Sequence, residues 1–289
     1  MLWLKTSRNK IVWLIFGILA LANFFVWLAI FETWPTPKIK ISFFDVGQGS
    51  AIFLAAQNGN QVLVDGGPSD AILTKLGENL PLFDKKIELL ILTHPDSDHL
   101  NGLIEVLKKY EVGAVLETGI ADNSSNYLFW HQLLKENNTP IYIAHLGQAI
   151  RIADGFEIKI LAPLVKIAGQ SSGSINNTSI AGKVIYGQNS LIFTGDAEKA
   201  EETQLISSGL NLKAQILSVG HHGSKNSSGA DFLAAVDAST AVIQVGRNNR
   251  YGHPSQEALE RLKNSEIWRT DLEGDINFEC DLNECLKID

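Results

Sequence analysis

The chain has 289 residues, of which 45% are hydrophobic and 19% are charged, a balance that fits a folded protein and excludes disorder over most of its length. Its formal net charge of −8 excludes a general electrostatic nucleic-acid binder, so a polyanionic substrate would have to be held locally or through metal ions. Two cysteines exclude a disulfide scaffold and a cysteine-rich zinc module.

The N-terminal region contains an uncharged apolar run, Ile11 to Phe31, of 21 residues. A bilayer core needs roughly 20 such residues, and the apolar region of a cleaved signal peptide is shorter, about 7–15 residues. Three positive charges precede the run, at Lys5, Arg8 and Lys10, which favours a cytoplasmic N-terminus. We therefore expect a cytoplasmic segment (1–10), a single transmembrane anchor (11–31), a linker (32–39) and an extracytoplasmic domain (40–289).

The remainder of the chain alternates short apolar runs with helical patterns. The predicted strands cover 38–46, 50–56, 61–65, 87–93, 112–118, 141–145, 156–162, 179–187, 190–196, 215–220, 239–246 and 274–280. The predicted helices cover 69–80, 100–110, 125–137, 197–208, 229–236 and 255–264. Strands this apolar must be covered by helices, so the pattern predicts an α/β fold with four layers, an αββα sandwich.

A dense group of metal-type side chains follows the apolar strand 87–93. The motif Thr93–His99 holds His94, Asp96, Asp98 and His99 within six residues, and a strand-to-helix loop can bring them to one point. Histidine nitrogens and carboxylate oxygens lie about 2.0–2.2 Å from a bound ion, which requires such convergence. Asp98 is a candidate N-cap for a helix that starts at Leu100. The alternative is an Asp-rich turn with solvated histidines.

Two further motifs stand at predicted strand ends. Gly195-Asp196 follows one strand, and it is either a metal-binding turn or an ordinary turn. His221-His222-Gly223 follows another, and the pair suggests one ligand beside one neighbour, or a pair on the surface.

Together these motifs resemble the metallo-β-lactamase superfamily and, within it, the C-terminal hydrolase domain of ComEC-type DNA-uptake proteins. The matching segments are 44–49, 64–67, 93–99, 176–179, 193–196, 221–228, 249–254 and 269–271. The resemblance implies a hydrolase with two divalent metal ions, zinc or manganese, with magnesium as a further option. It also implies ligand roles for His94, Asp96, Asp98, His99 and Asp196, with His221 or His222 completing the set. Asp65 would support the metal loop.

The chain departs from the family pattern at three positions. Asp96 replaces the second histidine of the first motif, Asn176 or Asn177 replaces a later histidine, and Ser50 stands where these domains usually carry Asp. The first two changes enrich the site in oxygen, which favours harder ions such as Mn²⁺ and Mg²⁺ beside Zn²⁺.

Several other residues have both a functional and a structural interpretation. His253 is either a general acid or phosphate contact, or a residue that caps its loop; His131 and His145 are read as structural or surface residues. Cys280 and Cys285 could form a disulfide if the domain is exported. The candidate substrate contacts, for which the alternative is a solvated face, are Asn177, Ser224, Lys225, Arg247, Asn248, Asn249, Arg250 and Arg269.

We expect a membrane-anchored hydrolase of phosphodiesters, DNA included, with Asp98 and His253 in catalytic roles. Two metal ions about 3.5–4 Å apart can activate water and neutralise phosphoryl charge, which suits this reaction. The alternatives are hydrolysis of a small ester, such as a phosphocholine ester or a thioester, and a non-catalytic anchored binding domain. Sequence names no protein partner.

Overall fold

The structure, a computed structural model, describes residues 2–32, 38–81 and 83–288. It forms two units, Met1–Thr36 and Pro37–Asp289, which are described separately. The first contains helix α1 (Leu2–Glu32), whose apolar side chains between residues 12 and 28 are exposed. Within the described residues, no helix is both long enough and apolar enough to cross a membrane, so the predicted span Ile11–Phe31 is not confirmed. Most of the predicted linker, residues 33–37, lies outside the described residues.

One sheet of the second unit is built from both ends of the domain. Its strands are β1 (Ile39–Phe43), β2 (Ile52–Ala55), β3 (Gln61–Val64), β5 (Leu89–Ile91), β7 (Val115–Glu117), β8 (Ile141–Ile143), β16 (Ile276–Cys280) and β17 (Cys285–Ile288). They lie in the order β17-β16-β1-β2-β3-β5-β7-β8. The strands from β3 to β8 are parallel, whereas the others pair antiparallel.

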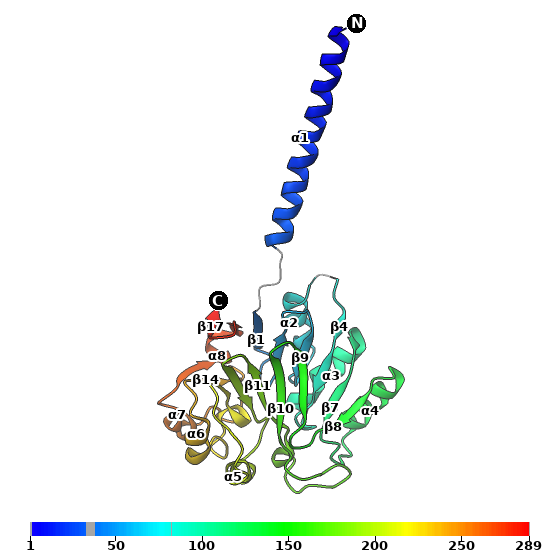
Figure 1. Ribbon diagram of the computed structural model, residues 1–289. Coiled ribbons are helices and arrows are strands. Elements are labelled where there is room, and N and C mark those ends of the chain that lie inside the picture. The colour runs from blue at the N-terminus through cyan, green and yellow to red at the C-terminus, as the bar shows by residue number, and fades with distance from the viewer. Residues whose placement is uncertain (1, 33–37, 82, 289) are drawn as a thin grey trace. The chain divides into compact units, whose positions relative to one another are not determined.

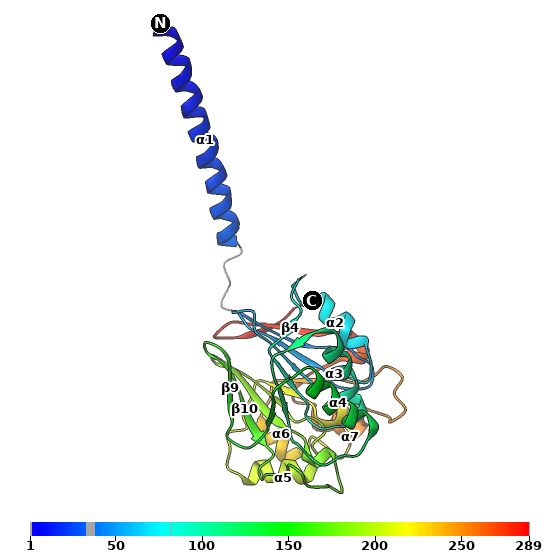
Figure 2. The same cartoon turned by 90° about the vertical axis from the view of Figure 1, so that its right-hand side faces the viewer.

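The second sheet comes from the middle and later part of the domain. Its strands are β9 (Ala149–Ala153), β10 (Phe156–Ala162), β11 (Ala181–Tyr186), β12 (Asn189–Phe193), β13 (Ile216–Ser218), β14 (Thr240–Ile243) and β15 (Glu266–Arg269), in the order β15-β14-β13-β12-β11-β10-β9. Strands β12 to β15 are parallel. β9 and β10 lie side by side at one edge (Figure 1, Figure 2). A small separate sheet pairs β4 (Lys86–Ile87) with β6 (Glu111–Val112).

Helices cover the outer face of each sheet. The first sheet is covered by α2 (Ala71–Asn79), α3 (Ser97–Lys109) and α4 (Ser125–Glu136), and the second by α5 (Lys199–Ser207), α6 (Ala230–Val236) and α7 (Gln256–Arg261) (Figure 1). α8 (Thr270–Glu273) follows β15, and short 3-10 turns cover Asn176–Thr178 and Gly220–Gly223. A third core lies between the sheets, where side chains such as Phe43, Phe193 and Val242 are buried. The predicted αββα sandwich is therefore confirmed.

The predicted elements agree with the observed ones except at the weakest patterns. The predicted strands 179–187 and 190–196 correspond to β11 and β12, which form a hairpin around Gly187-Gln188 in which Tyr186 pairs with Asn189. Three strands were not predicted, β9, β15 and β17; each ends a sheet, and edge strands need less apolar sequence. Cys280 and Cys285, opposite each other on β16 and β17, form a disulfide.

The topology brings the polar motifs together. Asp65 follows β3, the Thr93–His99 motif follows β5, Asp196 follows β12 and the histidine pair follows β13. Each of these strands runs parallel to a neighbour in its sheet, so each motif leaves at a carboxyl end, where ligand sites in parallel sheets form.

Candidate metal centre

The loop from β5 to α3 carries four of the predicted ligands. α3 begins at Ser97 with Asp96 in the N-cap position, so the expectation that Asp98 caps a helix starting at Leu100 is wrong. Asp98 instead lies in the first helical turn, where its negative charge interacts favourably with the positive end of the helix dipole. Gly102 lets this helix pack closely against the backbone at Gly66, because a Cβ at position 102 would collide with the Gly66 carbonyl.

A buried carboxylate, Asp65, fixes the orientation of two histidines. It accepts hydrogen bonds from the Thr93 amide (2.8 Å), the Thr93 hydroxyl (2.8 Å) and His99 Nδ1 (2.7 Å). Since the hydroxyl donates to Asp65, it accepts from His94 Nδ1 at 3.0 Å. Both imidazoles thereby use Nδ1 for a hydrogen bond within the protein, which leaves Nε2 available to a metal ion. Asp65 thus holds the loop that carries the predicted ligands, through Thr93 and His99.

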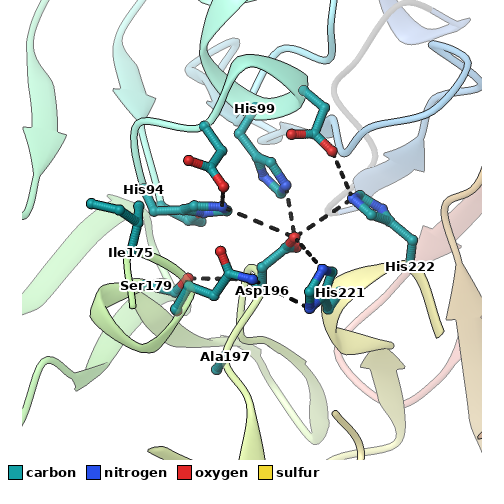
Figure 3. A network of polar contacts seen from close by, with 12 residues as sticks. His94, His99, Ile175, Ser179, Asp196, Ala197, His221 and His222 are labelled. Carbon is teal, nitrogen blue, oxygen red and sulfur yellow. Dashed lines mark hydrogen bonds and ion pairs between the residues drawn. The ribbon is translucent and has the colours of Figure 1, made fainter. Parts of the chain in front are cut away.

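Asp196 lies at the centre of the polar cluster (Figure 3). The preceding residue, Gly195, has φ +51° and lies against Thr93, so that a Cβ there would collide with the Thr93 side chain. Glycine at this position therefore allows the turn that carries Asp196. The amide of Asp196 donates to Ser179 Oγ at 3.2 Å, which fixes the turn. An ordinary Gly-Asp turn would leave this carboxylate in solvent, whereas here the residue is 3% exposed.

The histidine pair sits on a strained backbone. His221 and His222 both have positive φ, +50° and +54°, which is uncommon for residues other than glycine and typical of functional sites. His222 is buried and donates from Nδ1 to the carbonyl of Gln244 at 2.9 Å, so its Nε2 faces Asp98 Oδ2 at 3.2 Å. His221 is more exposed, and its Nδ1 lies 3.4 Å from the Asn176 amide nitrogen.

The cluster has two halves that share Asp196 (Figure 3). In one half, the carboxylate oxygens of Asp98 and Asp196 and one nitrogen each of His99 and His222 all lie within 4.8 Å of one another. In the other half, His94 Nε2 lies 3.7 Å from Asp96 Oδ2 and 4.0 Å from Asp196 Oδ2. His221 Nε2 lies 3.6 Å from the same Asp196 oxygen.

Electrostatics keep the carboxylates ionised despite their burial. Burial alone would raise the pKa of Asp98, but the hydrogen bond from His222 and the positive potential of His99 and His222 lower it to about 2. Burial likewise opposes ionisation of Asp196, yet the surrounding histidines hold its pKa well below the ordinary value. The reciprocal effect raises the pKa of His99 well above its ordinary range, because Asp196 and Asp65 outweigh the cost of burial.

The donor set fits divalent metal ions. His94 Nε2, His99 Nε2 and Asp196 Oδ1 are buried and have no hydrogen-bond partner among the described residues, although burying polar groups in this state is costly. Ligand atoms about 2.0–2.2 Å from one ion are separated from each other by roughly 3–4 Å, and His99 Nε2 lies 3.2 Å from Asp196 Oδ1. Divalent ions bound in the two halves would satisfy these atoms, and an ion beside His99 would displace the proton that its raised pKa favours.

The remaining predicted residues differ in their surroundings. Arg247 and Arg269 both donate hydrogen bonds to Asp271, and Asn248 is exposed. Asn177 and Ser224 are engaged within the protein, since Asn177 binds the amide of Glu198 and Ser224 is buried. Lys225 and Arg250 are exposed. His253 lies beside the cluster, its ring 5.7 Å from that of His221.

His131 and His145 lie outside the cluster, as expected. His131 Nε2 lies 3.3 Å from the buried Glu117, and His145 contacts the carbonyl of Leu146.

Two contributors were not identified from the sequence. Glu198 approaches His221 Nδ1 at 3.8 Å, and its place two residues after Asp196 was the only available signal. Gln244 orients His222 through its backbone carbonyl, which any residue could offer, so no sequence signal exists for it.

Fold and site together define a metallohydrolase, and the chain belongs to the metallo-beta-lactamase superfamily, whose family model matches residues 44–247. It is 32% identical over 260 residues to ComE operon protein 3 of Bacillus subtilis, covering 83% of this chain and 33% of that protein. It is 30% identical over 271 residues to Recombination protein 2 of Haemophilus influenzae, covering 90% of this chain and 30% of that one. The chain thus spans about a third of the length of these relatives.

Among solved structures, the fold is similar to that of the metallo-beta-lactamase fold protein YhfI from Bacillus subtilis. The TM-score is 0.52 at 14% identity, over 81% of this chain and 97% of that one. At this identity the likeness concerns the fold alone.

Proposed function

We propose that the domain is a metal-dependent phosphodiesterase that acts on DNA or a related phosphodiester. The observation that carries this proposal is the shared position of Asp196 between two groups of ligand-type side chains. Two divalent ions bound there would supply hydroxide at neutral pH and neutralise charge on a phosphoryl oxygen. One relative is named a recombination protein and another, from Neisseria gonorrhoeae, a competence protein, and these names favour DNA as the polymer.

The protein's own side chains would divide the remaining work. Asp65 and the Gln244 carbonyl hold the imidazoles in place, so little reorganisation is needed when the ions bind. We propose that His253, which is partly exposed and lies beside His221, gives a proton to the leaving oxygen. Lys225 and Arg250 supply exposed positive charge for the substrate's phosphates.

The ligand set is compatible with three divalent ions. Asp96 contributes a carboxylate oxygen to the half that contains His94, and oxygen ligands suit Mn²⁺ and Mg²⁺, whereas the imidazoles suit Zn²⁺.

The test uses the full chain, stripped with EDTA and reloaded separately with Mn²⁺, Mg²⁺ or Zn²⁺. We expect hydrolysis of a single-stranded oligonucleotide and of a small phosphodiester to need added metal. A metal at about 100 times its Kd should also stabilise the folded protein by about 2.7 kcal/mol. Metal bound without turnover of either substrate would favour the small-ester hydrolase, assayed next with a phosphocholine ester and a thioester. No bound metal would favour the non-catalytic binding domain.

We further propose that α1 anchors the domain to a membrane with the domain outside the cytoplasm. The uncharged run from Ile11 to Phe31 and the exposed apolar side chains of α1 support the anchor. The Cys280–Cys285 disulfide supports the location, because disulfides persist in oxidising compartments. The expected result is that the chain sediments with membranes and that protease added to intact spheroplasts digests the domain. A protected domain would refute the orientation, and a chain released by a high-salt wash would refute the anchor.

A further inference from the structure

A line of aromatic rings leads from the protein surface to the metal-type cluster. At the surface, Tyr251 lies nearly parallel to His253, with ring centroids 6.0 Å apart and an interplanar angle of 21°. His253 in turn meets His221 edge-on at 5.7 Å. His221 Nε2 lies 3.6 Å from Asp196, so Tyr251 stands two rings away from the centre of the site.

The loop that carries Tyr251 is held in shape by one side chain. The Asn249 amide donates to the carbonyls of Gly246 (3.0 Å) and His253 (2.6 Å). Its oxygen accepts from the amides of Tyr251 (3.2 Å) and His253 (2.9 Å). Asn249, a candidate substrate contact, is thus occupied within the loop. A ring fixed in this way can bind a ligand without the entropic cost of ordering the loop.

The ring remains available although it has neighbours on the protein. Tyr251 is 55% exposed, so a ligand can reach its side chain. Arg250 lies beside it, with the guanidinium carbon 5.2 Å from the ring centroid and one hydrogen bond, 3.1 Å, to the Tyr251 hydroxyl. A guanidinium has five N–H donors, so the other donors can reach a phosphate.

We propose that Tyr251 stacks on a nucleobase of the substrate and gives the site a preference for phosphodiesters that carry an unpaired base. This proposal rests on the proposed phosphodiesterase function. An aromatic platform beside a cation is the arrangement that binds single strands, since every base has a face that can stack. Bases in a duplex are already stacked on each other. Because the chain has a net charge of −8, it does not attract a polyanion as a whole, and such a local contact would hold the nucleic acid instead.

The experiment compares two fluorescent strands of equal length and charge, a single-stranded oligonucleotide and its abasic counterpart. Binding is measured by fluorescence polarisation in EDTA and with Mn²⁺, and KM is measured where turnover occurs. The full-length protein should bind the base-bearing strand about 5- to 150-fold more tightly, the range expected for one stacked base. Tyr251→Ala should remove this difference by weakening only the base-bearing strand, and Tyr251→Phe should keep most of it. Tyr142→Ala is the matched control, because Tyr142 on β8 is also 55% exposed.

The two proposals fail in different ways. If the wild-type protein discriminates between the strands but hydrolyses neither, the phosphodiesterase function is refuted and base stacking stands. If Tyr251→Ala keeps the wild-type discrimination, or weakens both strands equally, base stacking is refuted whatever the turnover. Wild-type protein that binds both strands equally refutes it as well.

Discussion

The Asp98→Asn variant is expected to lose turnover by about 10³-fold or more. Its carboxylate belongs to the group formed with His99, Asp196 and His222, and with a pKa of about 2 it is negatively charged at every physiological pH. Asparagine removes that charge from the ligand set while keeping the shape of the side chain. Metal ions contribute several kcal/mol to stabilising the transition state in such sites, and each 1.36 kcal/mol is tenfold in rate.

The fold should survive this substitution. Asp98 does not cap α3, so the expected loss combines that of one carboxylate in a first helical turn, about 0.3–1 kcal/mol, with a weaker contact to His222 Nε2, for which asparagine still offers an oxygen. Glu105→Gln is the matched control, because it removes one negative charge from the same helix, where Glu105 pairs with Lys108 at 2.7 Å. The measurements are metal-dependent turnover, metal affinity by calorimetry and the urea unfolding midpoint. Wild-type turnover in Asp98→Asn would refute a metal-ligand role for this residue.

The Asp65→Ala variant is expected to lower the free energy of unfolding by about 3–5 kcal/mol, as removal of one partner from a buried charged pair does. Three donors from Thr93 and His99 would then be buried without an acceptor. Alanine would also have to adopt φ +58°, which is unfavourable for a residue with a Cβ. The comparison is made by urea denaturation in EDTA, so that lost metal binding does not contribute.

Asp65→Asn separates stability from site organisation. Asparagine tolerates positive φ and still offers an oxygen to Thr93, so the loss of stability should be smaller. Its amide cannot fully replace the carboxylate that accepts from His99, and changes at such supporting residues typically cost 10- to 100-fold in metal affinity. An unfolding free energy within 1 kcal/mol of wild type for Asp65→Ala would show that the network does not stabilise the domain.

The sequence by itself determined the layered fold and the residues that could bind metal. Apolar strands need cover on both faces, which led to the αββα arrangement. His94, Asp98 and Asp196 stood out because polar, ligand-type side chains follow directly after buried strands. These features are local, and they are therefore readable from neighbouring residues alone.

Only the tertiary structure decided how the histidine pair is used. In the sequence, His221 and His222 were equivalent candidates for the metal ligand. Positive φ at both positions directs His222 into the buried group and leaves His221 beside Asn176. The orientation of the His222 ring depends on the backbone carbonyl of Gln244, which follows a strand and lies 22 residues later in the chain. The same applies to Asp65, which meets Thr93 and His99 only because β3 and β5 are neighbours. Backbone dihedrals and contacts between distant strands set these relations, and neither is written in any single motif.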